Sequence, residues 1–152
     1  MPYNNSCWFH TRKSRFHTRL HLDLSTKVQV GGESMSKNVL LEYAEQLATS
    51  CELLCKSLKN SANTVFQLRK SSSSVYANIS EAQYPQSLAD MLSKFKIARK
   101  ECAETESWLK LLFNTGCIDE QTFKDYRNLC GRITRLLTSS CVTIEKRIAE
   151  QK

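Results

Sequence analysis

Four residues near the start of the chain carry side chains that can bind zinc: Cys7, His10, His17 and His21. Thiolate and imidazole groups are the ligands that Zn²⁺ prefers, in tetrahedral sets of four. Two, six and three residues separate these four in the sequence, and that spacing matches no common zinc module. All three histidines of the chain lie in this set. The sequence therefore predicts no metal or other cofactor, and it leaves no histidine elsewhere for acid–base or di-iron chemistry.

Carboxylates give a second candidate for chemistry, because Glu101 and Glu104 would lie on neighbouring turns of a helix, with Glu81 on another. No phosphate-binding glycine loop and no nucleophile with a nearby histidine accompanies them. We therefore predict that the protein is not an enzyme. We expect Glu81 and Asn78 to be structural polar residues, partly buried and satisfied by hydrogen bonds or by an arginine such as Arg69.

Basic side chains are the remaining candidates, and the chain carries a net charge of +7. Several of them follow one another at helical spacing outside the apolar positions. They form either a solvated surface with ion pairs to Glu101, Glu106 or Asp125, or a surface that contacts the phosphates of RNA or DNA. The candidates for phosphate contact are Arg69, Lys70, Lys94, Lys96, Arg99, Lys100, Arg127, Arg132 and Arg135.

Few residues interrupt the part of the chain that must position these side chains. After Met35, the only glycines and prolines are Pro85, Gly116 and Gly131, which indicates a small number of long helices. We expect the helices at about 36–59, 67–83, 86–114 and 119–149, with Ser36 and Asp119 as caps. The connections between them are short, so the sequence predicts an all-α fold, an antiparallel up-down-up-down four-helix bundle.

Each predicted helix has one apolar stripe with steps of three and four residues. Trp108 and a few other large apolar residues lie beside the stripes. They either widen the same core or form a second buried surface, most simply the interface of a homo-oligomer. The stripes are Leu40, Ala44, Leu47, Cys51, Leu54 and Leu58; Val65, Leu68, Ser72, Val75, Ile79 and Ala82; Leu88, Met91, Phe95, Ala98, Cys102, Thr105, Leu109 and Leu112; and Phe123, Tyr126, Cys130, Ile133, Leu137, Ser140 and Ile144.

Residues 1–34 differ from the rest and end in a linker-like Gly31-Gly32 pair. We interpret them as a disordered or extension segment ahead of a bundle at 35–152. Two alternatives stay open, a basic arm that touches nucleic acid and an organelle transit peptide. The chain has no apolar stretch long enough to span a membrane. Its seven cysteines form an odd set without a disulfide framework, which favours a reduced, cytoplasmic protein.

The motifs of the central helices resemble the four-helix-bundle family encoded in 23S rRNA intervening sequences. The resemblance rests on residues 67–70 and 74–82, continues through 95–99, 104–105 and 116–119, and covers roughly residues 40–148. The family usually has proline where Tyr76 stands and glycine where Ala82 stands. Its architecture is similar to that of the accessory proteins of diversity-generating retroelements, which form pentameric barrels and bind nucleic acid and a reverse transcriptase. The resemblance implies a homo-oligomer and supplies no catalytic residue.

Two functions follow as hypotheses. The first is a non-enzymatic, oligomeric bundle that binds nucleic acid through its basic helix faces. The alternative is a protein-interaction adaptor, such as an accessory subunit for the reverse transcriptase of a diversity-generating retroelement, with Trp108 as an anchor in its interface.

Overall fold

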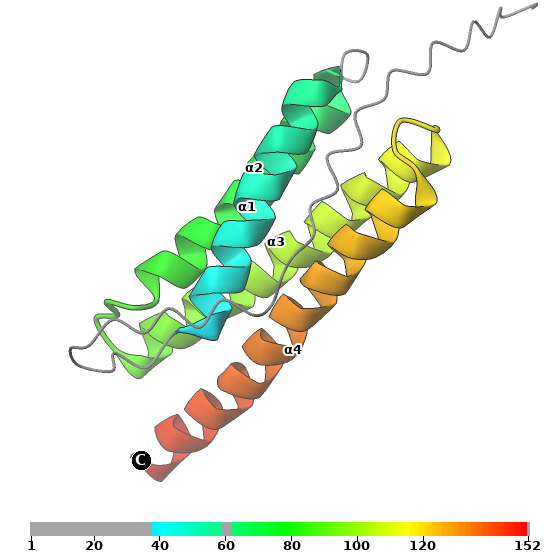
Figure 1. The fold of residues 1–152 in the computed structure, drawn as a ribbon. Coiled ribbons are helices and arrows are strands. Elements are labelled where there is room, and N and C mark those ends of the chain that lie inside the picture. Colours follow the sequence, from blue (N-terminus) through cyan, green and yellow to red (C-terminus); the bar gives the residue numbers. More distant parts are fainter. Residues whose placement is uncertain (1–37, 59–61, 152) are drawn as a thin grey trace, which may run out of the picture. The chain divides into compact units, whose positions relative to one another are not determined.

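The computed structural model describes residues 38–58 and 62–151, all within the unit formed by residues 36–152. In this part of the chain the protein contains four helices and no strand (Figure 1). They are α1 (Val39–Ser57), α2 (Ala62–Glu81), α3 (Leu88–Asn114) and α4 (Glu120–Glu150). The all-α prediction and the four-helix bundle are confirmed. The predicted extension at 1–34 and its zinc-binding side chains lie outside the described residues.

Short polar side chains cap three of the helices, as helix N-termini require. The Asn38 side chain accepts a hydrogen bond from the Leu41 N–H, Ser87 does the same for Asp90, and Asp119 for Thr122. Asp119 is the cap that the sequence predicted. The expected cap of the first helix, Ser36, lies outside the described residues, and α1 begins three residues later than predicted, with Asn38 as its cap.

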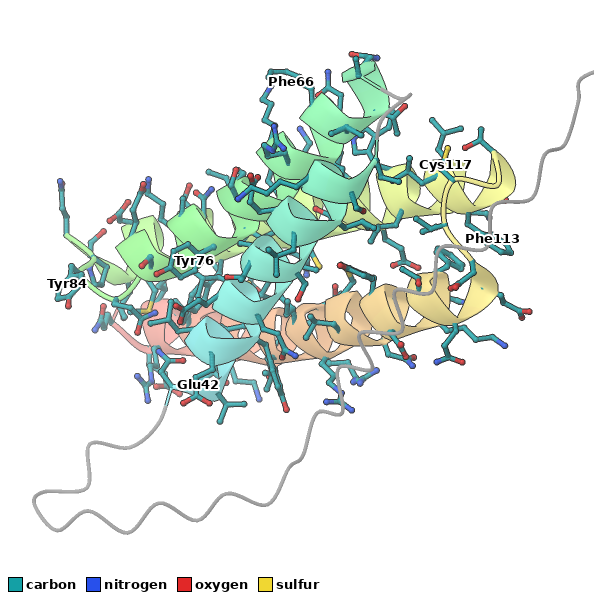
Figure 2. The ribbon with its side chains drawn as sticks, turned by 45° about the horizontal axis from the view of Figure 1, so that its top comes forward. Glu42, Phe66, Tyr76, Tyr84, Phe113 and Cys117 are labelled. Atoms are coloured by element: carbon teal, nitrogen blue, oxygen red, sulfur yellow. The ribbon has the colours of Figure 1, made fainter. Side chains whose placement is uncertain are left out.

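The turn between α3 and α4 is a glycine C-cap, and it ends α3 within a few residues of the start of α4. Gly116 has a φ of 71°, a conformation that glycine adopts without strain. The Cys117 N–H donates to the Leu112 carbonyl at 2.9 Å and the Gly116 N–H to the Phe113 carbonyl at 3.0 Å. These two bonds define a Schellman motif. The Phe113 and Phe123 rings stack across this turn, with centroids 5.1 Å apart (Figure 2 labels Phe113).

The core follows most of the predicted stripes, but Leu88 and Met91 of α3 and Phe123 and Tyr126 of α4 are only partly buried, and two buried positions are shifted by one residue. In α1 the buried residue after Cys51 is Cys55, while Leu54 and Leu58 are only partly buried. In α4 it is Cys141, while Ser140 is only partly buried. The predictions of Leu54 and Ser140 as core positions were therefore wrong. An undistorted helix completes one turn every 3.6 residues. A stripe predicted with a period of 3.5 residues therefore rotates away from the core over several turns.

A small polar layer crosses the middle of the core. The Thr105 hydroxyl lies 2.9 Å from the Ser71 hydroxyl, and both side chains are buried. Ser71 also bonds to the Leu68 carbonyl, and Thr105 to the Glu101 carbonyl. Every buried side-chain nitrogen and oxygen among the described residues has a partner. The layer therefore joins α2 to α3 without leaving a polar group unsatisfied.

Contacts between helix pairs identify the neighbours around the bundle. Cys55 of α1 bonds to the Val65 carbonyl of α2 at 3.5 Å, and Ser71 of α2 meets Thr105 of α3. The Cys102 thiol of α3 lies 3.5 Å from the Cys130 carbonyl of α4. The Tyr126 hydroxyl of α4 donates to the Ser50 carbonyl of α1 at 2.8 Å. Each helix thus packs against two others, and Figure 1 shows α1 beside α2 and α3 beside α4.

Removing the cap of α4 should destabilise the protein in a pH-dependent way. The Thr122 N–H donates to the Asp119 carboxylate at 2.7 Å, and this bond lowers the pKa of Asp119 below its ordinary value of 3.8. A lowered pKa in the folded state contributes stability above pH 3.8 that is lost as the pH falls through the folded-state value. We expect Asp119→Ala to cost about 1 kcal/mol of unfolding free energy at pH 7 and less near pH 3, measured by urea denaturation.

Asp119→Asn is the matched control, because an asparagine still caps the helix but does not titrate. Its unfolding free energy at pH 7 should stay close to that of the unmodified chain. An equal loss for Asp119→Ala at both pH values would contradict the role of the ionised carboxylate.

Candidate nucleic-acid interface

The described residues contain no metal-ligand cluster. No group of three or more His, Cys, Asp or Glu side chains at 38–58 and 62–151 is placed to hold a metal ion. None of the helices in this part of the chain is long and apolar enough to cross a membrane.

Buried thiols occupy the core instead of charged groups. Cys51, Cys102 and Cys130 are fully buried, and none of the six described cysteines forms a disulfide. Burial raises the pKa of the Cys51 thiol to about 12, and the hydrogen bond with Cys102 together with burial raises that of Cys130. The Cys51 and Cys130 thiols are therefore protonated near neutral pH, and all three side chains pack as small apolar groups.

Four of the predicted phosphate-binding residues are held in ion pairs. Arg69 pairs with Glu52 of α1 at 2.6 Å, and Lys94 pairs with Glu81 of α2. The hydrogen bond with Glu81 raises the pKa of Lys94. Two further pairs cross from α3 to α4, Lys96 with Glu145 at 2.8 Å and Arg127 with Glu106 at 3.3 Å. Exposed pairs of this kind contribute little stability, but each one neutralises part of the positive surface.

The other five predicted cations have no carboxylate partner among the described residues. Arg132 stacks over the Tyr43 ring at 5.8 Å, near the contact between α1 and α4. The remaining four are exposed and have no ion pair within 38–58 and 62–151: Lys70, Arg99, Lys100 and Arg135.

Sequence reasoning missed three further cations with the same properties: Lys110, Lys146 and Arg147. Lys110 stands apart from the other basic residues, and Lys146 and Arg147 are adjacent near the end of α4. Helical spacing could have identified Lys146, because it lies eleven residues after Arg135, close to three full turns.

Most of the unpaired cations lie on the outer side of α3 and α4. On α3, steps of four and three residues connect Lys96, Lys100, Ala103, Ser107 and Lys110, and all five are exposed. On α4 the corresponding stripe runs from Lys124 through Arg135 and Val142 to Lys146. The two ion pairs that cross between these helices, Lys96 with Glu145 and Arg127 with Glu106, place the stripes on one side of the molecule.

Arg99 belongs to the same side. Burial raises the pKa of the Cys141 thiol, and the positive charge of Arg99 opposes that rise, so this guanidinium lies close to α4. We define the α3–α4 face as eight cations, of which Arg99, Lys100, Lys110, Arg135 and Lys146 have no ion pair to another described residue. The complete set is Lys96, Arg99, Lys100, Lys110, Lys124, Arg127, Arg135 and Lys146.

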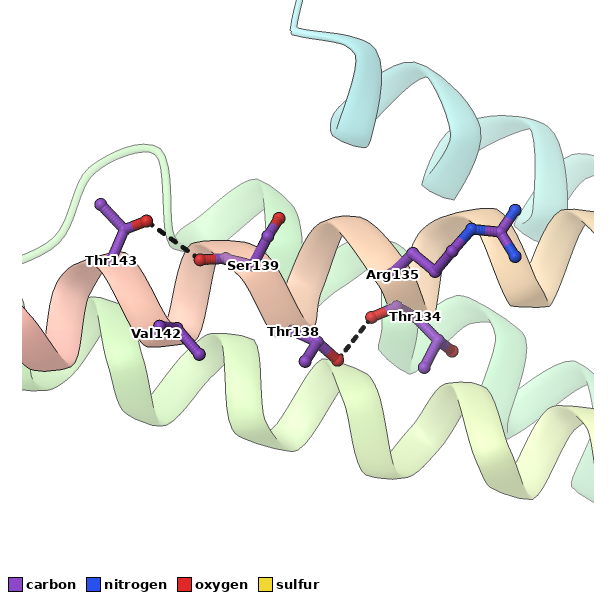
Figure 3. Close-up of a pocket in the computed structure, with 6 residues that line it drawn as sticks. All are labelled: Thr134, Arg135, Thr138, Ser139, Val142 and Thr143. Atoms are coloured by element: carbon purple, nitrogen blue, oxygen red, sulfur yellow. Dashed lines mark hydrogen bonds between the residues drawn. The ribbon is translucent and has the colours of Figure 1, made fainter.

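A shallow hollow lies on α4 along residues 134–143 (Figure 3). Threonine and serine hydroxyls line it, together with Arg135 and Val142. The Thr138 hydroxyl donates to the Thr134 carbonyl at 2.8 Å, and Thr143 donates to the Ser139 carbonyl at 3.0 Å. With their protons directed to the backbone, these hydroxyls present a polar, uncharged surface between the cations.

The residues predicted to have structural or interface roles are on other surfaces. Asn78 is half-buried and donates to the Ser74 carbonyl at 2.9 Å and to its hydroxyl at 3.3 Å. Glu81 is 58% exposed and pairs with Lys94, and the arginine suggested for it, Arg69, pairs with α1 instead. Trp108 is half-buried against the core, and its Nε1 donates to Glu104 at 3.1 Å.

Comparison with known proteins gives one family and one solved structure of note. No curated protein matches the chain. A structure from Bacteroides thetaiotaomicron, described as a protein of unknown function from the S23 ribosomal protein family, is 35% identical to this chain. The match has a TM-score of 0.64 and covers 68% of this chain and 98% of that one. The family model of the 23S rRNA-intervening sequence protein matches residues 36–139. Because this match takes in all of α1, α2 and α3 and most of α4, the chain belongs to the 23S rRNA-intervening sequence protein family.

Proposed function

We propose that this protein binds nucleic acid, by phosphate contact, and that it acts by binding and not by catalysis. One observation carries the proposal: seven exposed cations of the described helices have neither a carboxylate partner nor a contact with an aromatic ring. Unpaired Lys and Arg side chains keep their full charge for an anionic ligand. They are Lys70, Arg99, Lys100, Lys110, Arg135, Lys146 and Arg147.

The family description supports the same proposal independently of the charge distribution. It connects the members of the family with intervening sequences of 23S rRNA, and the Bacteroides relative is described within a ribosomal protein family. RNA is therefore the first ligand to test. The description alone does not carry the proposal, because it names no ligand for any member.

We infer in addition that the bundle is antiparallel, in an up-down-up-down arrangement. The contacts support this, because partners on neighbouring helices run in opposite directions along the sequence. Between α2 and α3, Ser71 meets Thr105 and Glu81 meets Lys94. Between α3 and α4, Glu106 meets Arg127 and Lys96 meets Glu145. The short connections between consecutive helices fit the same arrangement.

Binding should weaken steeply as the salt concentration rises. Each neutralised phosphate of a duplex releases condensed counterions, so the logarithm of the binding constant falls with a slope of about 0.9 per contact. If five cations engage phosphates, binding to an RNA hairpin should weaken roughly 500-fold between 50 and 200 mM NaCl. Fluorescence anisotropy of a labelled hairpin with the full chain measures this directly. No binding at 50 mM NaCl, or an affinity that salt leaves unchanged, would end the proposal.

A further inference from the structure

We propose that the α3–α4 face is the surface that binds nucleic acid, and that its ligand is a double helix contacted through its phosphates. This inference rests on the proposed function and makes it specific in two respects, the surface and the form of the nucleic acid.

The distribution of unpaired charge selects the surface. Five of the seven unpaired cations lie on the α3–α4 face, and its acidic residues, Glu106, Glu120 and Glu145, are each held in an ion pair. The outward side of α3 next to α2 instead carries Glu101 and Glu104. A polyanion would therefore meet the strongest net attraction on the α3–α4 face.

The shape of this face fits a rigid, extended ligand. Lys96 and Lys110 are separated by 14 residues of one helix, a rise of about 21 Å, and Arg135 and Lys146 by about 16 Å along the other. Small or short side chains, Ala103 and Ser107 on α3 and Thr138 on α4, occupy the positions between them. The result is two straight rows of cations on neighbouring helices, with small or short side chains between successive cations of each row.

The absence of free aromatic rings on this face selects double-stranded over single-stranded ligands. Proteins that bind single strands combine cations with aromatic side chains on which bases stack. The exposed aromatic residues of the described chain, Phe66 and Tyr84, lie on α2 and in the turn after it (Figure 2). The two rings at the end of the α3–α4 pair, Phe113 and Phe123, are half-buried and stacked on each other. Base stacking is then not available on this face, and its cations are suited to phosphate contact, which is indifferent to base sequence.

The experiment compares two triple variants of the full chain that remove the same number of charges. Arg99→Gln, Lys100→Gln and Arg135→Gln together remove three cations of the face. The matched control replaces Lys56, Arg69 and Lys94 with glutamine, three cations outside this face that are held in ion pairs. Each protein is titrated into a 20-base-pair RNA duplex, the DNA duplex of the same sequence, and an unstructured 20-nucleotide RNA, by anisotropy at several NaCl concentrations, with circular dichroism to verify folding.

We expect the face variant to bind both duplexes on the order of tenfold to hundredfold more weakly than the unmodified chain, with a salt slope smaller by about 3. The control should change by less than about threefold, and the single strand should bind more weakly than either duplex. Equal losses in the two variants would overturn the assignment of the surface while leaving nucleic-acid binding intact. A single strand that binds as tightly as the duplexes would overturn the assignment of the ligand. If the unmodified chain binds none of the three, the proposed function itself fails.

Discussion

Replacing Leu47 with alanine should remove about 2–5 kcal/mol of unfolding free energy, a large part of the stability of a domain of this size. Leu47 lies in the middle of α1 and is fully buried. The substitution loses the transfer free energy of the deleted groups and leaves a cavity that the neighbouring helices only partly close. Because the backbone of α1 lies close to those of α2 and α4, the loss weakens the interfaces that hold α1 in the bundle.

Leu53 supplies the matched control in the same helix. Its side chain is 58% exposed, so Leu53→Ala removes little buried surface and should change the unfolding free energy by less than about 0.5 kcal/mol. Urea denaturation of both variants, followed by circular dichroism, gives the comparison. Similar losses in the two variants would show that α1 does not bury the side that the fold assigns to the core.

The sequence was sufficient for the number of helices and for most of the core, because both depend on local spacing, although α2 begins at Ala62, five residues before the predicted start. Val65, Leu68, Val75 and Ile79 recur at three and four residues and are all buried, as the pattern of α2 predicts. Where prediction went wrong, at Leu54 and Ser140, a stripe had to be extrapolated over several turns. With a period of 3.6 residues per turn, Cys55 and Cys141 face the core more directly than Leu54 and Ser140 do. A cysteine side chain is also small enough to enter a close helix contact.

The candidate site was only half predictable, for a different reason. That Lys96 and Arg99 are outside the apolar stripe follows from their position in the sequence. That Lys96 is neutralised and Arg99 is not depends on Glu145, which is on another helix 49 residues away. The choice between an ion-paired surface and a phosphate-binding one therefore required the neighbours of each helix. Some of the predicted cations, such as Lys96, are held in ion pairs, and others, such as Arg99, have no ion pair to another described residue.

Replacing each of three alanines with aspartate, one at a time, should distinguish an effect on folding from an effect on nucleic-acid binding. Ala98 of α3 is fully buried, so Ala98→Asp would place a carboxylate in the core without a partner, at a cost of several kcal/mol. We expect this variant to unfold or to be recovered as aggregate, and to lose nucleic-acid binding for that reason. Circular dichroism and size-exclusion chromatography provide the measurement.

Ala103→Asp and Ala77→Asp make the same change of charge at exposed positions, where the intrinsic preference of aspartate costs a helix only about 0.6 kcal/mol. Both should therefore fold. Ala103 lies on the α3–α4 face, three and four residues after Lys100 and Arg99, so its aspartate would pair with them and compete with phosphate. Ala77 lies on α2, away from that face. Duplex binding at low salt should then fall several-fold for Ala103→Asp and stay unchanged for Ala77→Asp. If both variants bind alike, net charge alone governs binding and the α3–α4 face has no special part in it. If only Ala103→Asp is affected, the same helix that buries Ala98 in the core presents its opposite side to the nucleic acid.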